Sequence, residues 1–275
     1  MKRTYYCPKG GLPDQSKRLY SPAIITNSYA VIPAKVMSDI VTSNLPLWAG
    51  ARAWILARPM SGFAETFAQL IVELAPGGGS AEPEPNPMAE AIIFVVEGTL
   101  TLTIGEIQHE LNEGGYAFVA PGSNWAVSNT TDQTVTFHWF RKEYEKVGGI
   151  ENPHSFVTND QSVDPIPMPD SKGAWATSRF VDPADLRHDM HVNVVTFQPG
   201  GVIPFAETHV MEHGIYVLQG TAKYLLNTDW VTVGPGDFMW LRAFCPQACE
   251  ATGKEPFRYL LYKDVNRHPK LRLGS

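Results

Sequence analysis

Cysteine, charged residues and long apolar runs are all scarce in this sequence of 275 residues. The cysteines, Cys7, Cys245 and Cys249, are too few for a disulfide framework and favour a reducing compartment. Charged residues make up only 18% of the chain and the net charge is −6, which argues against a nucleic-acid or anionic-membrane partner. The sequence has no run of about eighteen uncharged apolar residues and no N-terminal apolar core of signal-peptide length. We therefore expect a soluble, cytoplasmic protein with no membrane contact.

The residues that are abundant point to a β-rich globular protein. Hydrophobic residues make up 44% of the chain, and 23 glycines and 22 prolines suit short strands with tight turns. Residues 64–74 fit a helix or a strand, but their β-branched content and the Pro76–Gly79 stop favour a strand that ends there. Further strands are expected at 92–98, 100–104, 114–122, 135–140 and 190–197.

The two halves of the chain repeat one another. Gly78 matches Gly200, and residues 95–98 match residues 217–220, both 122 positions further on. Residues 113–118 match 234–239 at an offset of 121. Two offsets that agree within one residue indicate a tandem repeat of a small β unit.

Potential metal ligands gather between Gly200 and Gly220. Glu207 and His209 are two positions apart, so on a strand both point to the same face, and His213 follows closely. A polar cluster held by hydrogen bonds at a barrel mouth is the alternative to a metal site.

A zinc peptidase is a second alternative, because residues 209–213 also satisfy the pattern H-x-x-E-H. That motif requires a helix, so that both histidines share one face. Pro204, Gly214 and the apolar run 215–218 favour strands instead. Glu212 is therefore expected on another face and not as a general base.

Lys263 ends a segment of alternating polarity. The alternation places Phe257, Tyr259, Leu261 and Lys263 on one face, which the apolar members make the inward face. A buried lysine is rare unless it is paired or functional. The alternative is that Lys263 extends from the strand end into solvent.

Each half resembles a cupin, a family of small β-barrels. The family's first motif is G-x5-H-x-H-x3–4-E-x6-G, and the second half keeps this frame from Gly200 to Gly220. The resemblance implies an all-β fold of two tandem cupin barrels (double-stranded β-helix, or jelly-roll). The expected boundaries are an N-terminal segment packing on the barrels at 1–50, an N-terminal barrel at 51–145, a linker at 146–178 and a C-terminal barrel at 179–275.

The cupin frame implies a ligand set. Glu207 takes the place of the family's first histidine, His209 that of the second and His213 that of the glutamate. The second motif, counted from Gly236, places Gln247 at the remaining metal position. The equivalent positions in the first half cannot bind a metal through their side chains: Pro85, Pro87, Ala91 and Ala126. We therefore expect one metal per chain, held by the C-terminal barrel.

The likeness is most specific to the (S)-ureidoglycine aminohydrolase family, whose bacterial members are called glyoxylate-induced proteins. It is carried by residues 207–214, 246–248 and 257–264, which read ETHVMEHG, PQA and FRYLLYKD. The resemblance implies a bicupin that uses Mn²⁺ to release ammonia from ureidoglycine in purine degradation. It also implies a homo-oligomer that binds a small-molecule substrate.

The resemblance further implies catalytic roles for Lys263, Tyr259 and Glu207, with substrate contacts from these three residues and Gln247. The donors are two imidazoles, a carboxylate and an amide, a set that suits open six-coordinate Mn²⁺ or Fe²⁺. An Fe(II)-dependent cupin oxygenase and a non-enzymatic ligand-binding cupin are the rival functions.

Overall fold

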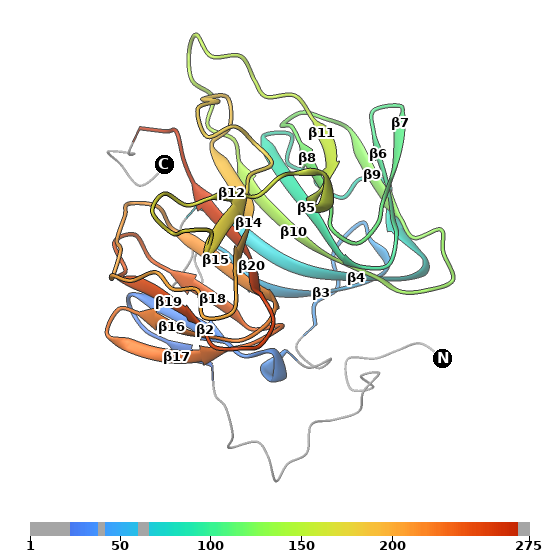
Figure 1. Ribbon diagram of the computed structural model, residues 1–275. Coiled ribbons are helices and arrows are strands. Elements are labelled where there is room, and N and C mark those ends of the chain that lie inside the picture. Colours follow the sequence, from blue (N-terminus) through green and yellow to red (C-terminus); the bar gives the residue numbers. More distant parts are fainter. Residues whose placement is uncertain (1–22, 38–41, 60–65, 269–275) are drawn as a thin grey trace.

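The computed structural model describes residues 23–37, 42–59 and 66–268, and it divides into two β-barrels (Figure 1). Cys7 lies outside the described residues. Within them the regular structure consists of strands and short 3-10 turns at Ala34–Val36 (η2) and Asp160–Ser162 (η4). No helix in this part of the chain is long and apolar enough to cross a membrane.

The N-terminal barrel is a continuous antiparallel sheet in the order β11-β8-β5-β10-β4-β9-β6-β7, with β3 paired to β4. Its main strands are β3 (Ala49–Ala57), β4 (Ala68–Ser80), β5 (Ala89–Glu97), β6 (Leu100–Ile104), β7 (Ile107–Leu111), β8 (Gly115–Val119), β9 (Trp125–Ser128) and β10 (Val135–Glu143). The strands expected at 92–98, 100–104, 114–122 and 135–140 are all present in this sheet.

The C-terminal barrel repeats this arrangement. Its larger sheet runs β1-β2-β18-β15-β20-β14-β13-β12 and its smaller sheet runs β17-β16-β19. Its main strands are β14 (Met190–Phe197), β15 (His213–Gln219), β16 (Ala222–Leu226), β17 (Asp229–Val233), β18 (Phe238–Leu241), β19 (Gln247–Ala251) and β20 (Phe257–Asp264). The all-β fold of two tandem barrels that the cupin resemblance implies is therefore confirmed.

Segments outside the repeats complete the sheets and tie the barrels together. From the N-terminal segment, β2 (Tyr29–Ile32) pairs with β1 (Ile24–Ile25) and with β18 of the C-terminal barrel. From the segment between the barrels, β11 (Phe156–Asn159) pairs with β8 of the N-terminal barrel. β12 (Ile166–Pro167) and β13 (Trp175–Ser178) then extend the C-terminal sheet at β14. The C-terminal barrel thus includes strands from the N-terminal segment of the chain, and the N-terminal barrel includes a strand from the segment that joins the two barrels.

The expected end of the first long strand at Pro76–Gly79 is wrong, because β4 continues to Ser80. The glycines allow a close backbone approach instead of stopping the strand. A Cβ atom on Gly79 would lie 2.3 Å from the carbonyl oxygen of Val127, where β4 passes onto β9. Only glycine fits at such a crossing.

The large C-terminal sheet has one face inside its barrel and one face against the other barrel. The inward residues include Val195, Ile215 and Tyr259, which belong to the core of the C-terminal barrel. The outward residues Val192 and Tyr262 join a separate core with Phe94 and other N-terminal side chains. Alternation along β14, β15 and β20 therefore decides which side chains can reach the barrel interior.

Candidate metal centre

His209, His213 and Gln247 converge at the mouth of the C-terminal barrel. The Nε2 atom of His209 lies 3.0 Å from Nε2 of His213 and 3.0 Å from the side-chain amide of Gln247. His213 is the first residue of β15 and Gln247 the first of β19, while His209 lies on the loop before β15. Two strand starts and the loop before β15 thus bring together three of the four donors expected from the sequence.

The backbone fixes the ring of His213. Its Nδ1 atom lies 3.0 Å from the carbonyl oxygen of Glu212 and 3.1 Å from that of Tyr262. Nδ1 therefore carries the proton, and the lone pair of Nε2 faces the cluster, which is the tautomer that a metal ligand needs. Burial, together with the nearby His209 and Lys263, lowers the pKa of His213 to about 3, so this ring stays neutral.

Glu207 is held beside Gln247 by its backbone. The two residues form an isolated antiparallel bridge with reciprocal N–H···O=C hydrogen bonds of 2.9 Å. Burial raises the pKa of the Glu207 carboxyl, and the charge of Lys263 opposes that rise. Among the described residues, no three His, Cys, Asp or Glu side chains gather tightly enough to hold a metal ion. The Glu207 carboxylate therefore lies next to the cluster of His209, His213 and Gln247 but outside it.

A tyrosine pair behind Gln247 was not expected from the sequence. The hydroxyl of Tyr224 on β16 lies 3.0 Å from the amide of Gln247, and it also hydrogen-bonds to Tyr259 on β20. The oxygen and nitrogen of a glutamine amide are distinguished by their hydrogen bonds. In the structure the hydroxyl of Tyr224 donates to Oε1 of Gln247, and Nε2 of Gln247 faces His209, so the amide would have to be turned over for its oxygen to bind a cation. In the sequence, Tyr224 looks like any other aromatic residue of an apolar strand.

Tyr259 is as deeply buried as His213 and Gln247, each being 3% exposed. It is buried in the core of the C-terminal barrel, and burial raises its pKa well above the usual range. Its connection to the cluster runs through Tyr224 to Gln247.

Lys263 points into the barrel mouth, as the alternation predicts. It pairs with His213 across the ladder between β15 and β20, and paired residues project to the same face. Its side chain is half-buried, and in the described part of the chain no carboxylate forms an ion pair with it. Burial, with a contribution from the charge of Arg179, lowers the pKa of the Lys263 ammonium group.

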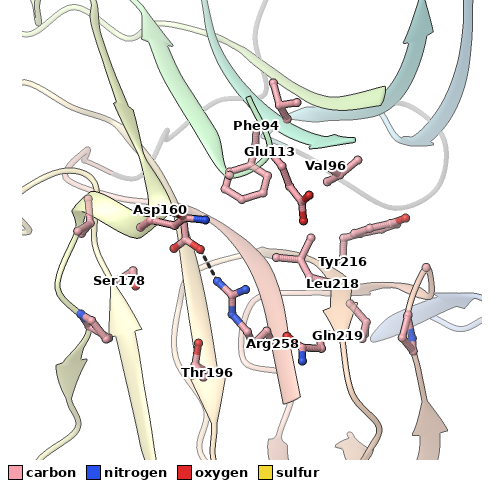
Figure 2. Close-up of a pocket in the computed structure, with 18 of the residues that line it drawn as sticks. Phe94, Val96, Glu113, Asp160, Ser178, Thr196, Tyr216, Leu218, Gln219 and Arg258 are labelled. Atoms are coloured by element: carbon pink, nitrogen blue, oxygen red, sulfur yellow. Dashed lines mark hydrogen bonds and ion pairs between the residues drawn. The ribbon is translucent and has the colours of Figure 1, made fainter. Parts of the chain in front are cut away.

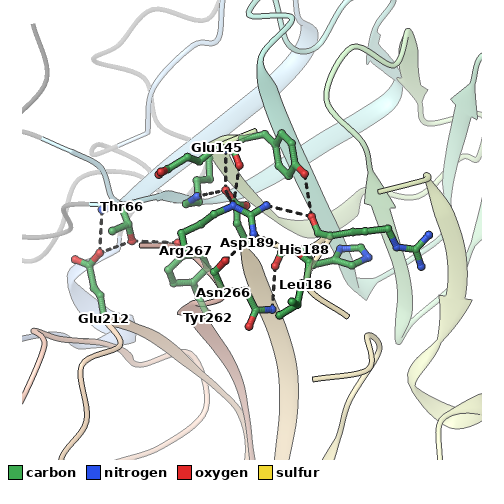
Figure 3. A network of polar contacts seen from close by, with 12 residues as sticks. Thr66, Glu145, Leu186, His188, Asp189, Glu212, Tyr262, Asn266 and Arg267 are labelled. Atoms are coloured by element: carbon green, nitrogen blue, oxygen red, sulfur yellow. Dashed lines mark hydrogen bonds and ion pairs between the residues drawn. The ribbon is translucent and has the colours of Figure 1, made fainter. Parts of the chain in front are cut away.

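Glu212 faces away from the cluster, toward the N-terminal barrel (Figure 3). Its carboxylate accepts hydrogen bonds from the backbone and hydroxyl of Thr66, at 2.9 and 2.6 Å, and from the indole of Trp240 at 2.6 Å. Residues 209–212 precede a strand and form no helix, so the two histidines meet by a loop-to-strand turn. The peptidase interpretation of H-x-x-E-H is therefore excluded.

A separate cavity of about 910 Å³ lies between the two barrels (Figure 2). It is lined by Phe94 and Glu113 from one barrel and by Tyr216 and Leu218 from the other, and an ion pair joins Arg258 to Asp160 across it. None of the four expected metal ligands lines this cavity. Its polar lining includes Glu113 and the Arg258–Asp160 pair but no histidine.

The donor cluster fits a hard or borderline divalent cation. Two imidazole nitrogens and the side-chain amide of Gln247 converge, a carboxylate lies alongside, and no thiolate takes part because Cys245 and Cys249 are buried elsewhere in the core. The Nε2 atoms of the two imidazoles are only 3.0 Å apart, and their lone pairs repel one another unless a proton or a cation lies between them. Nitrogen and oxygen donors of this kind suit Mn²⁺, Fe²⁺ or Zn²⁺.

The comparisons with known proteins agree with the fold. The cupin domain family matches residues 70–141 and again residues 193–262. These ranges coincide with the repeated strands of the two barrels. The chain is thus a two-domain cupin with its donor cluster in the C-terminal barrel.

Three similar proteins show which family of cupins the chain belongs to. The (S)-ureidoglycine aminohydrolase of Arabidopsis thaliana is 32% identical over 83% of this chain and 74% of that protein, and the Escherichia coli K12 enzyme of the same name is 28% identical over 83% and 86%. A Pseudomonas aeruginosa structure described as a glyoxylate induced protein is 61% identical, covers 99% of this chain and 100% of its own, and superposes with a TM-score of 0.90. The chain belongs to the (S)-ureidoglycine aminohydrolase family.

Proposed function

We propose that this protein is a manganese-dependent hydrolase that converts (S)-ureidoglycine to (S)-ureidoglycolate and ammonia. Water adds its oxygen to the substrate carbon that carries the amine, the carbon–nitrogen bond to that amine breaks, and the amine leaves as ammonia. The observation that carries the proposal is the convergence of His209, His213 and Gln247 beside the unpaired, half-buried Lys263. The relatives named above support the choice of substrate.

We infer that Glu207 joins these three residues as a fourth ligand. Its backbone is already fixed to Gln247, so a rotation of the side chain alone is needed. A bound Mn²⁺ would supply positive charge that anchors the substrate and polarises the reacting bond. Four protein ligands would leave adjacent positions of an octahedral ion open, as catalysis requires.

Lys263 serves as the proton-transferring residue in this proposal. Its lowered pKa brings the ammonium group closer to the range in which it can give up and regain a proton near neutrality. It can therefore donate a proton to the departing amine nitrogen after one has been taken from water. Tyr259, through Tyr224, holds Gln247 and so positions the substrate from behind.

The test is ammonia release from freshly prepared ureidoglycine by the metal-free protein, with and without added Mn²⁺. We expect ammonia and the (S)-product only when the ion is present. Lys263→Met should keep the bound metal and lose most of the turnover, by roughly 100-fold or more, since general acid–base catalysis contributes about that much. Full turnover by this variant would refute the role of Lys263.

Oxygen uptake separates the hydrolase from an Fe(II) oxygenase that would use the same ligand set. Ammonia release without oxygen consumption is expected, with equal rates in air and under argon. If the metal-loaded protein binds ureidoglycine but releases no ammonia, the non-enzymatic cupin is the better description.

A further inference from the structure

Three positions on neighbouring strands form one inward-facing row at the mouth of the C-terminal barrel. Lys263 on β20 pairs with His213 on β15 and, on its other side, with His191 on β14. Residues paired in this way project to the same face of a sheet. Because His213 belongs to the donor cluster, Lys263 and His191 face the same space.

Arg179 directly follows β13 and lies beside this row. The register of β13 with β14, which ends at Ser178 and Val194, would place Arg179 opposite Asn193, two residues along β14 from His191. Trp175 pairs with Phe197 and stacks on it inside the barrel at 5.2 Å, and Thr177 pairs with Val195 in the same direction. Alternation then directs Arg179, two residues after Thr177, to the inward face.

The neighbours of Arg179 confirm the alternation. Ser178 lines the cavity between the barrels (Figure 2). Phe180 stacks on Tyr116 of the N-terminal barrel, with the ring centroids 4.0 Å apart. Both therefore point away from the barrel interior.

Arg179 and Lys263 are close enough to influence one another. The charge of Arg179 contributes to the lowered pKa of both Lys263 and His191, with burial as the larger cause in each case. The Arg179 side chain is half-buried. In residues 23–37, 42–59 and 66–268 it has no hydrogen bond or ion pair, whereas Arg141 and Arg258 are paired with Glu84 and Asp160.

The Glu207 carboxylate favours the charge of Lys263, but no carboxylate of the described residues forms an ion pair with Lys263 or Arg179. The two partly desolvated cations are therefore costly, because each disfavours the charge of the other. An anion bound between them removes that cost. A guanidinium group presents parallel N–H donors that match a carboxylate, and its charge persists at any physiological pH. The ligand for this position is therefore a carboxylate on a molecule small enough to reach the donor cluster at the same time.

We propose that Arg179, together with Lys263, binds the carboxylate of the substrate and makes Arg179 the residue that selects α-carboxylated ureido compounds. This inference rests on the proposed function for the identity of the substrate. It places the carboxylate at the side of the barrel mouth formed by β13, β14 and β20. The amine of the same molecule then points across to His209, His213 and Gln247.

Binding of two stable probes tests the proposal. Ureidoacetate (hydantoate) carries the carboxylate and the ureido group but has no leaving amine, and its primary amide lacks the charge. Calorimetry with the Mn²⁺-loaded protein should give a lower Kd for the acid than for the amide. In Arg179→Gln we expect the Kd of the acid to rise roughly 10- to 100-fold, since hydrogen bonds to charged groups contribute about that factor. The Kd of the amide should stay unchanged.

Two further variants guard against a general loss of structure. Arg179→Lys keeps the charge but not the paired donors, and we expect an intermediate Kd for the acid. Lys223→Gln removes one positive charge from an exposed position on β16 of the same barrel and should leave both Kd values unchanged. Turnover of ureidoglycine by Arg179→Gln should show a raised KM with little change in kcat.

The inference is overturned if Arg179→Gln binds the acid as tightly as the wild type does, if acid and amide weaken equally, or if the wild type binds neither probe. Absence of ammonia release by the wild-type protein would instead reject the proposed function. The comparison of acid with amide reports on the carboxylate site in either case, so the two failures are distinguishable.

Discussion

The Nε2 atoms of His209 and His213 lie 3.0 Å apart, and the same atom of His209 lies 3.0 Å from the amide of Gln247. Such convergence predicts that a divalent cation stabilises the fold. A ligand at 100 times its Kd adds about 2.7 kcal/mol to the free energy of unfolding. At a few degrees per kcal/mol, Mn²⁺ should raise the Tm of the chelator-treated protein by roughly 5–10 °C.

His209→Ala should abolish that shift and the bound metal, measured by thermal unfolding and elemental analysis. His154→Ala serves as the control, because His154 is exposed and distant in sequence from the donors. An unchanged Mn²⁺ response in His209→Ala would contradict the candidate centre.

Tyr224 is predicted to act on metal binding through Gln247. Tyr224→Phe keeps the ring in the core but removes the hydroxyl that contacts the amide at 3.0 Å. Residues that orient a ligand typically contribute 10- to 100-fold in metal affinity, and we expect a loss of about that size in Mn²⁺ titrations.

Tyr116→Phe is the matched control, since it removes a buried hydroxyl that has no hydrogen-bond partner in the described part of the chain. An equal loss of affinity in both variants would point to general loosening and count against the role of Tyr224.

Glu212 is predicted to be structural although it lies between two histidines of the candidate metal centre in sequence. Glu212→Gln weakens the hydrogen bonds to Thr66, which connect the barrels (Figure 3), and the hydrogen bond to Trp240 within the C-terminal barrel. We expect the free energy of unfolding to fall by about 1–3 kcal/mol, the usual cost of a disturbed buried polar group.

Ammonia release per folded molecule should stay within a few-fold of the wild-type rate at low temperature. The exposed Glu250 provides the control variant Glu250→Gln, for which no stability loss is expected. Complete loss of turnover in folded Glu212→Gln would revive a general-base role.

His138 predicts how stability changes with pH. Burial lowers its pKa from 6.5 to about 3, so the folded state resists the proton that the unfolded state accepts. The stability that the neutral ring contributes is complete above pH 6.5 and falls as the pH drops from there toward 3. Between pH 7.5 and 5.0 this single group should account for a loss of about 2 kcal/mol.

Urea unfolding of the chelator-treated protein at the two pH values measures the effect. His138→Phe keeps an aromatic ring against Tyr216, 4.1 Å away, and removes the titration. Its loss between pH 7.5 and 5.0 should be smaller than that of the wild type by about the same 2 kcal/mol. An identical loss in both proteins would show that His138 takes up its proton without unfolding.

The internal repeat allowed the fold to be predicted from the sequence. Glycines at fixed offsets and strands with a period of two specify inward and outward faces, and the side chains of Tyr259 and Lys263 point as the alternation predicts. The strand end predicted at the glycine run 77–79 is wrong, because a run of glycines can mark either the end of a strand or a close crossing of two backbones.

The sequence alone determined that the chain forms two repeated β units, since local spacing fixes this feature. Its resemblance to cupins then implied Glu207, His209, His213 and Gln247 as the ligand set. The tertiary structure decided which strands become neighbours, because pairing depends on contacts between residues far apart in the chain. It placed Tyr224 behind Gln247 and turned Glu212 toward the other barrel. It also brought Arg179 and Lys263 to one inward face, where burial and the charge of Arg179 lower the pKa of Lys263.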